Sequence, residues 1–124
     1  MKKLLLIVVV AMIGVLGGCS TEYYHTHYVL TEQCAVREKQ QARQVQAMLA
    51  ENAVRLELDN VVNYAWKDPW FDLSSSKQSA IVKKIITTEH CLSDGRITEI
   101  NIFYAGYSVA FAGGGKIRVL KRKP

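Results

Sequence analysis

The sequence predicts an α+β fold, in which a long N-terminal amphipathic helix and a second helix precede a three-stranded antiparallel meander. Two observations support this prediction. The stretch from Glu32 to about Ala65 contains no Gly or Pro and is rich in strong helix formers. From Ile97 onward, apolar and polar residues alternate with the period of two that is typical of strands. The 124 residues suffice for one such domain.

The first helix is expected to begin at Thr31, whose side chain suits an N-cap, and to extend to about Ala65. Asp59-Asn60 is a candidate break within it. The segment WKDPWFDL (66–73) follows, and Pro69 disfavours the helical conformation at the residue before it. We therefore expect the helix to end before this segment.

A second helix is predicted from about Ser75 to Glu89. Ser75 and Gln78 have the spacing of a capping box, in which two side chains satisfy free backbone groups of the first turn. Four aliphatic residues recur with helical spacing and predict the buried stripe: Ile81, Val82, Ile85 and Ile86.

The meander is predicted to comprise residues 97–104, 107–112 and 116–122. Ala105-Gly106 is expected to form a tight turn between the first two strands, and the glycines at 113–115 separate the last two. One face of this small sheet would pack on the helices, and the other would face water.

The N-terminus has the pattern of an export signal. Lys2 and Lys3 precede an apolar run, Leu4 to Leu16, of 13 residues. A spanning helix needs about 20 apolar residues, so this run is too short to cross a bilayer. Small residues, Gly17 and Gly18, follow it, as they do at the cleavage site of an exported chain.

The order Leu16-Gly17-Gly18-Cys19 resembles the lipobox of bacterial prolipoproteins. This resemblance covers about the first 20 residues, and it implies that residues 1–18 are removed. It also implies a diacylglycerol on the Cys19 thiol and an acyl chain on the new amine. We expect no other cofactor. Each buried methylene contributes about 0.8 kcal/mol, so such chains would hold the protein at a membrane. The alternative is a plain secretory signal in which the cysteine occurs by chance.

Ser20 gives the expected destination, because the lipoprotein class uses an aspartate at this position for retention at the inner membrane. The resemblance therefore implies an outer-membrane lipoprotein that faces the periplasm, if the host is Gram-negative. We expect a lipidated tether over 19–30 and a single domain over 31–124.

Cys34 and Cys91 are the other two cysteines, and an exported domain places them in an oxidising compartment. A disulfide between them is therefore predicted. The alternative is two unpaired buried thiols.

No catalytic or metal-binding signature stands out. His25 and His27 form an H-x-H step without a fixed third ligand, which favours a solvated linker over a metal site. His90-Cys91 resembles a base and a nucleophile, but a disulfide would remove the thiol. Lys116 follows three glycines without the remaining residues of a phosphate-binding loop.

Charge gives no support for nucleic-acid binding. Removing Lys2 and Lys3 from the 16 basic residues leaves 14 against 11 acidic ones, which is a mild excess, and an exported protein does not meet cytoplasmic nucleic acid. No small-molecule substrate is indicated either.

These absences favour a non-enzymatic accessory protein that binds a partner in an envelope complex of secretion, pilus or conjugation type. The alternatives are a cell-envelope hydrolase and an exclusion or immunity lipoprotein of a mobile element. The candidate partner-binding residues form two sets. An aromatic loop provides Trp66, Trp70 and Phe71, which otherwise plug the core. The open edge of the last strand provides Ile117, Arg118 and Val119.

The lipobox yields a direct test. Cys19→Ala is expected to abolish labelling by a fatty-acid analogue and to release the protein from membranes, because no thiol remains to carry the lipid. Labelling and membrane fractionation of the variant measure this. Unchanged labelling and fractionation would contradict the lipoprotein prediction.

Overall fold

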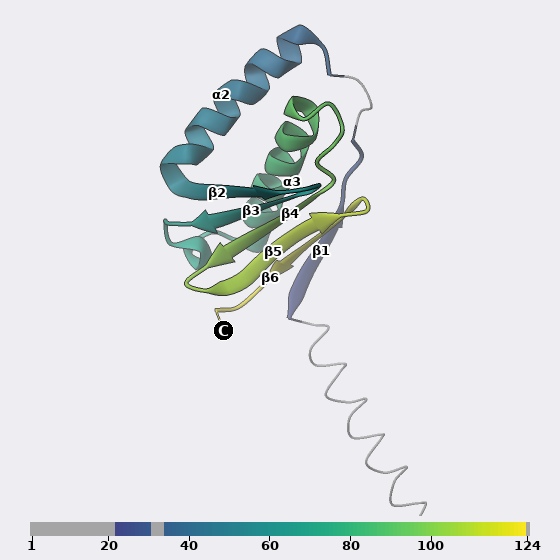
Figure 1. The fold of residues 1–124 in the computed structure, drawn as a ribbon. Helices are drawn as coiled ribbons and strands as arrows, with labels where there is room; N and C mark the ends of the chain where they lie inside the picture. The colour runs from purple at the N-terminus through teal and green to yellow at the C-terminus, as the bar shows by residue number, and fades with distance from the viewer. Residues whose placement is uncertain (1–21, 31–33, 124) are drawn as a thin grey trace, which may run out of the picture.

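A computed structural model describes residues 22–30 and 34–123 (Figure 1). The predicted signal segment, Cys19 and the start of the predicted tether lie outside the described residues. The elements in chain order are β1 (Tyr23–His27), α2 (Val36–Asn52), β2 (Ala53–Leu58), β3 (Val61–Trp66), the 3-10 helix η1 (Trp70–Asp72), α3 (Ser75–Leu92), β4 (Glu99–Tyr104), β5 (Tyr107–Gly113) and β6 (Lys116–Leu120).

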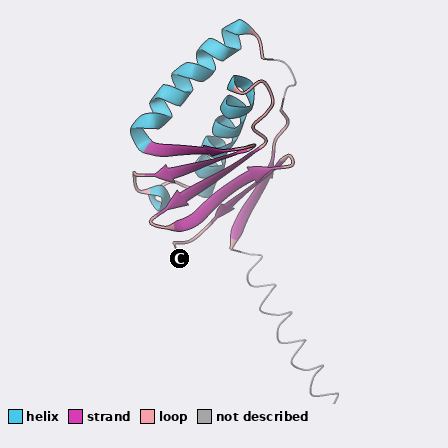
Figure 2. Ribbon diagram, viewed as in Figure 1, coloured by secondary structure: helices cyan, strands magenta, loops and turns pink. Residues whose placement is uncertain are grey.

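The described strands form one six-stranded mixed sheet in the order β1-β6-β5-β4-β3-β2 (Figure 2). Neighbouring strands are antiparallel except for β3 and β4, which are parallel. The α+β character agrees with the sequence prediction, but the three-stranded meander is wrong. It accounts for β4, β5 and β6 and omits the strands on either side of them.

The first predicted helix is too long. Helix α2 ends at Asn52, and the residues after it form the hairpin of β2 and β3. Asp59, the candidate break, begins the hairpin turn with a φ of 53°. The segment 53–58 contains Leu, Glu and Arg, which favour helices in isolation, but it also alternates apolar and charged residues. Pairing with β3 over six residues overrides the local preference.

The predicted tether contains a strand. Tyr23–His27 forms β1, which pairs antiparallel with β6 from Tyr23 opposite Leu120 to His27 opposite Lys116. The last strand therefore lies between β1 and β5, and the expectation that it forms an open edge is wrong. The segment YYHTH of β1 contains no aliphatic side chain, so no alternation of aliphatic and polar residues signals a strand from sequence.

Helix α3 packs across one face of the sheet, as Figure 1 shows. Its N-cap is Ser74, whose hydroxyl accepts the Lys77 N–H at 3.2 Å, so the cap lies one residue earlier than predicted. Gln78 makes no capping box. It is buried, and its Nε2 donates to the Trp70 carbonyl at 3.0 Å. Side chains from α3 and from the covered sheet face form the core.

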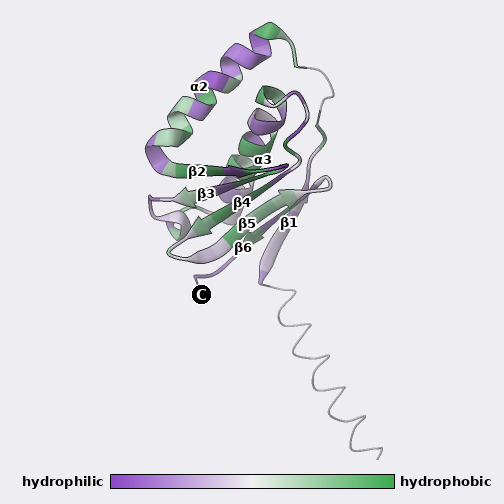
Figure 3. Ribbon diagram, viewed as in Figure 1, coloured by the Kyte–Doolittle hydropathy of each residue, from purple (hydrophilic) through white to green (hydrophobic). Residues whose placement is uncertain are grey.

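Helix α2 packs mainly against α3, and its main contact with the sheet is with β2. Only Ala42 and Leu49 are buried in it, and Figure 3 draws much of it in the purple of hydrophilic residues. Both helices thus leave the other face of the sheet uncovered.

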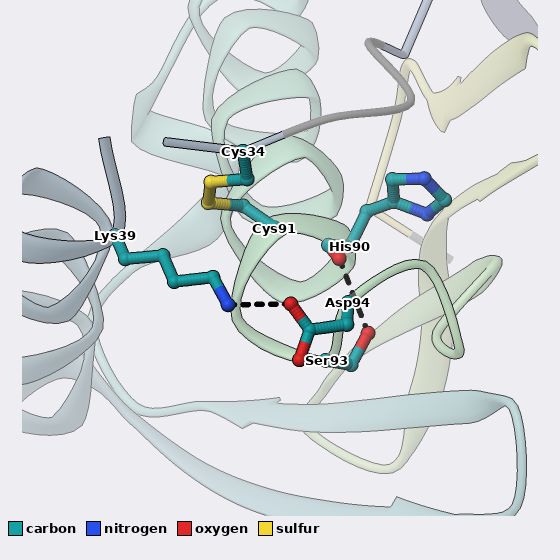
Figure 4. The surroundings of a disulfide bond; sticks show 6 residues. All are labelled: Cys34, Lys39, His90, Cys91, Ser93 and Asp94. Atoms are coloured by element: carbon teal, nitrogen blue, oxygen red, sulfur yellow. Dashed lines mark hydrogen bonds and ion pairs between the residues drawn. A yellow bond between two sulfur atoms is a disulfide. The ribbon is translucent and has the colours of Figure 1, made fainter. Parts of the chain in front are cut away.

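The predicted disulfide is present between Cys34 and Cys91 (Figure 4). The two Cα atoms are 5.4 Å apart, a usual spacing for a disulfide. The bond joins the residues just before α2 to the last turn of α3. Lys39 of α2 makes an ion pair with Asp94, which follows α3, and adds a second link between the two helices.

The disulfide closes a loop with a sequence separation of 57. In the chain-entropy model such a loop contributes about 4 kcal/mol, a large part of the ~5–15 kcal/mol that stabilises a typical domain. Replacing Cys34 and Cys91 together by Ala is expected to lower the free energy of unfolding by several kcal/mol, measured by urea denaturation.

Lys39→Ala is the matched control, because it removes the exposed ion pair and keeps the covalent link. It should cost less than about 1 kcal/mol. Equal losses from the two variants would contradict a dominant role of the disulfide.

Candidate interaction surface

The uncovered face of the sheet carries an apolar patch at its β2 end. Side chains alternate between the two faces, so the exposed apolar residues of β2, β3 and β4 lie together on the face without helices. We call the following residues the outer patch: Val54, Leu56, Leu58, Ala65 and Phe103.

The register of the strands builds this patch. Val54 lies opposite Ala65 on the neighbouring strand, and Ala65 lies opposite Phe103. The three side chains form one row across β2, β3 and β4. With Leu56 and Asn63 they line an open hollow of about 420 Å³.

The aliphatic side chains of β2 in the outer patch are more than half exposed. Val54, Leu56 and Leu58 keep 59%, 58% and 57% of their surface accessible, and Phe103 keeps 36%. Scattered apolar residues are ordinary on a surface, but a contiguous group at one end of an open sheet is typical of an interaction site.

The opposite side of β2 carries charges. Arg55 points toward α3, where its Nε donates to Glu89 Oε2 at 2.7 Å and its Nη2 donates to Glu89 Oε1 at 2.6 Å. Nη2 also donates to Glu57 Oε1 at 2.8 Å. Arg96 Nη2 donates to the other Glu57 oxygen, Oε2, at 2.5 Å.

Glu89 is the buried member of this network, with 1% of its side chain exposed. The Tyr64 hydroxyl donates a further hydrogen bond to Glu89 Oε2. Burial, together with the Glu89 carboxylate, raises the pKa of Tyr64 above its ordinary value. Hydrogen bonds to Glu89 raise the pKa of Arg55, and those from Arg55 and Arg96 lower the pKa of Glu57. Both oxygens of Glu89 are thus occupied, and the network ties the hairpin to α3.

A second hollow, of about 230 Å³, lies between α2 and α3 beside the disulfide, with Ala42, Val45 and Thr88 in its wall. His90 also lines it, but its Nδ1 lies 2.9 Å from the Ile97 carbonyl. The Cys91 sulfur is in the disulfide, so the His90-Cys91 step offers no thiolate.

The aromatic residues proposed from sequence as a partner site lie in or against the core. Trp70 is fully buried, Trp66 is 8% exposed and Phe71 packs against the core cluster. The rings of Trp66 and Trp70 meet edge to face with centroids 5.3 Å apart. In this fold they present little surface to a partner.

The residues proposed at the last strand are also placed inside the sheet. Ile117 and Val119 are buried among the core side chains. Arg118 lies on the uncovered face, with its guanidinium carbon 5.1 Å from the ring centre of Tyr23 and 5.4 Å from that of Phe111.

His25 and His27 are exposed at alternate positions of β1. Within the described ranges, 22–30 and 34–123, no group of three or more His, Cys, Asp or Glu side chains is arranged to hold a metal ion. Nor does any helix in the part of the chain that the structure describes have the length and apolar character needed to span a bilayer.

Comparisons with protein-family models, with curated proteins and with solved structures find no match to this chain. The outer patch therefore rests on the geometry of the sheet alone. The outer patch is not predicted from the sequence, because residues 53–58 are expected there to lie in a helix. The alternation of Val54, Leu56 and Leu58 with Arg55 and Glu57 is the signal that points to it.

The Tyr64–Glu89 contact predicts a loss of stability at alkaline pH. The pKa of Tyr64 is higher in the folded state than in the unfolded state, where it is about 10. The contribution of Tyr64 to the free energy of unfolding is therefore fully present below this unfolded-state pKa and is lost as the pH rises above it. The loss should reach up to ~1.4 kcal/mol per pH unit. Tyr64→Phe should flatten this slope in urea denaturation between pH 8 and pH 11.

Tyr107→Phe is the control, because it removes the same hydroxyl from a side chain that is 55% exposed. It should retain the wild-type slope. An unchanged slope in Tyr64→Phe would show that Tyr64 is not the group responsible.

Proposed function

We propose that this chain is a lipid-anchored accessory protein that binds a protein partner of a bacterial envelope complex and has no turnover of its own. The observation that carries the proposal is the outer patch, an exposed apolar surface on an uncovered sheet face. The partner presents a complementary apolar surface. The lipobox resemblance of Leu16 to Cys19 and the residue Ser20 support a place at the periplasmic side of the outer membrane.

The fold would hold the domain close to such an anchor. Only residues 20–22 separate Cys19 from β1, so the strand would begin within roughly 14 Å of the acylated residue at ~3.3–3.6 Å per residue. The Lys121 N–H donates to the Glu22 carbonyl at 2.7 Å. The basic segment 121–123 therefore lies at the same end of the sheet as the start of β1, where a lipidated Cys19 would bring it near anionic lipid headgroups.

The outer patch lies at the other side of the sheet. Strands β1 and β2 are the two edges, five strand spacings apart, which is roughly 24 Å at ~4.8 Å per spacing. A partner would thus reach the patch without displacing the anchored edge. This arrangement suits a protein that presents one surface to a complex while its other edge stays at the membrane.

The buried carboxylate supports a binding role over catalysis. Glu89 is the fully buried acidic side chain among the described residues, and Arg55 and Tyr64 occupy both of its oxygens. A general acid or base must reach a substrate, and this one is enclosed by its own partners.

The proposal is tested at Ala65, which lies at the centre of the patch and is exposed. A photo-crosslinking amino acid at this position should yield a specific adduct with another envelope protein. Ala65→Lys should then lower the affinity for the identified partner at least about tenfold, because a charge would be buried in an apolar contact. Binding of the purified pair measures the change.

Ala80 provides the matched control, because it is an exposed alanine on α3, which covers the opposite face of the sheet. The crosslinker at Ala80 should not capture the same protein, and Ala80→Lys should leave the affinity unchanged. Equal adducts from both positions, or hydrolysis of a cell-wall or lipid substrate by the purified protein, would contradict the proposal.

A further inference from the structure

Strand β2 is an edge of the sheet (Figure 1). Its hydrogen-bond register with β3 shows which of its backbone groups face outward. The Lys67 N–H donates to the Asn52 carbonyl at 2.8 Å, so these two residues form a hydrogen-bonded pair. Such pairs alternate along an antiparallel ladder, so Val54 and Leu56 bond to β3. The N–H and C=O groups of Arg55 and Glu57 therefore point to the open side, where no described residue pairs with them.

We propose that the β2 edge binds the β2 edge of a second copy of this chain. The two strands run antiparallel around a two-fold axis at Leu56. Arg55 of each copy then faces Glu57 of the other as a hydrogen-bonded pair, and Val54 faces Leu58. The two sheets join into one continuous sheet through backbone hydrogen bonds.

The charges of β2 select this partner and this register. Opposite charges directly across two strands stabilise the pairing, and this register forms two Arg–Glu pairs, one on each side of the axis. Centring the axis on Arg55 would place the two arginines opposite each other, which is unfavourable. The Arg55 Nε and Nη2 are engaged by Glu89 and Glu57, whereas Nη1 has no acceptor among the described residues and is free for the second copy.

The apolar side chains agree with the same register. Leu56 meets Leu56 at the axis, and the pairs of Val54 with Leu58 lie on either side. All of these residues are more than half exposed in the single chain. Inward-pointing charges usually protect an edge strand from indiscriminate pairing, so Arg55 and Glu57 discourage other strands while they fit a second β2.

This inference goes beyond the proposed function and does not depend on it. Pairing at the edge leaves the face of the sheet open, so the outer patches of two copies would lie side by side. A failure to pair would leave the capture of a partner at Ala65 unaffected.

The test uses single cysteine substitutions in the full chain, followed by mild oxidation of whole cells. Leu56 faces its own copy in a non-hydrogen-bonded pair, whose Cα separation of about 4.5 Å suits a disulfide. Leu56→Cys is therefore expected to give a disulfide-linked dimer on non-reducing gels. The parent chain, oxidised in the same way, gives the background.

Val54→Cys and Leu58→Cys are the matched controls, because both replace exposed apolar residues of the same strand. Neither faces itself in the proposed register, so each alone should give at least fivefold less dimer than Leu56→Cys. Co-expression of Val54→Cys and Leu58→Cys with different tags should restore crosslinking between the two chains.

A charge variant gives an independent readout. Glu57→Lys in the Leu56→Cys chain places like charges opposite each other and should reduce the crosslinked fraction severalfold. Asp94→Lys breaks an exposed ion pair elsewhere and should not reduce it. Background crosslinking at Leu56→Cys, equal crosslinking at all three positions, or an adduct at Leu56→Cys with a different protein would each overturn the proposal.

Discussion

The burial of Glu89 is the constraint on which the rest of this structure depends. A carboxylate that is 1% exposed must be paired, because an unpaired charge in the interior costs several kcal/mol. Arg55 and Tyr64 meet this requirement from β2 and β3, so the hairpin is held against α3 in one orientation. A shift of β2 by one residue would turn Arg55 outward and leave the carboxylate without its cation.

The same constraint creates the outer patch. Once Arg55 and Glu57 lie on the helix side of β2, alternation places Val54, Leu56 and Leu58 on the uncovered side. The apolar surface and the buried ion pair are therefore two consequences of one register. This relation explains why a small domain, with few residues to spare for its core, keeps three aliphatic side chains exposed on one strand.

The disulfide secures helix α2, whereas pairing within the sheet secures strand β1. Cys34 and Cys91 tie α2 to α3 covalently, which secures a helix that buries only two of its own residues. Strand β1 is secured by pairing with β6 and by a 2.6 Å hydrogen bond between the Thr26 and Ser79 hydroxyls. Strand β1 is therefore an integral part of the sheet and belongs to the same unit as α3 and β6.

The sequence by itself determined the elements whose signals are local. Helix α3 has its serine N-terminus and aliphatic stripe, and β4 to β6 have alternation between glycine turns. The two cysteines outside the predicted lipobox, Cys34 and Cys91, allow one pairing. Tertiary structure decided the rest. Whether 53–58 continues a helix depends on β3 and on a carboxylate in α3, and whether 23–27 forms a strand depends on β6 near the far end of the chain. Local propensity is worth only tenths of a kcal/mol per residue. Strand pairing with distant segments and the need to pair the buried Glu89 carboxylate outweigh it.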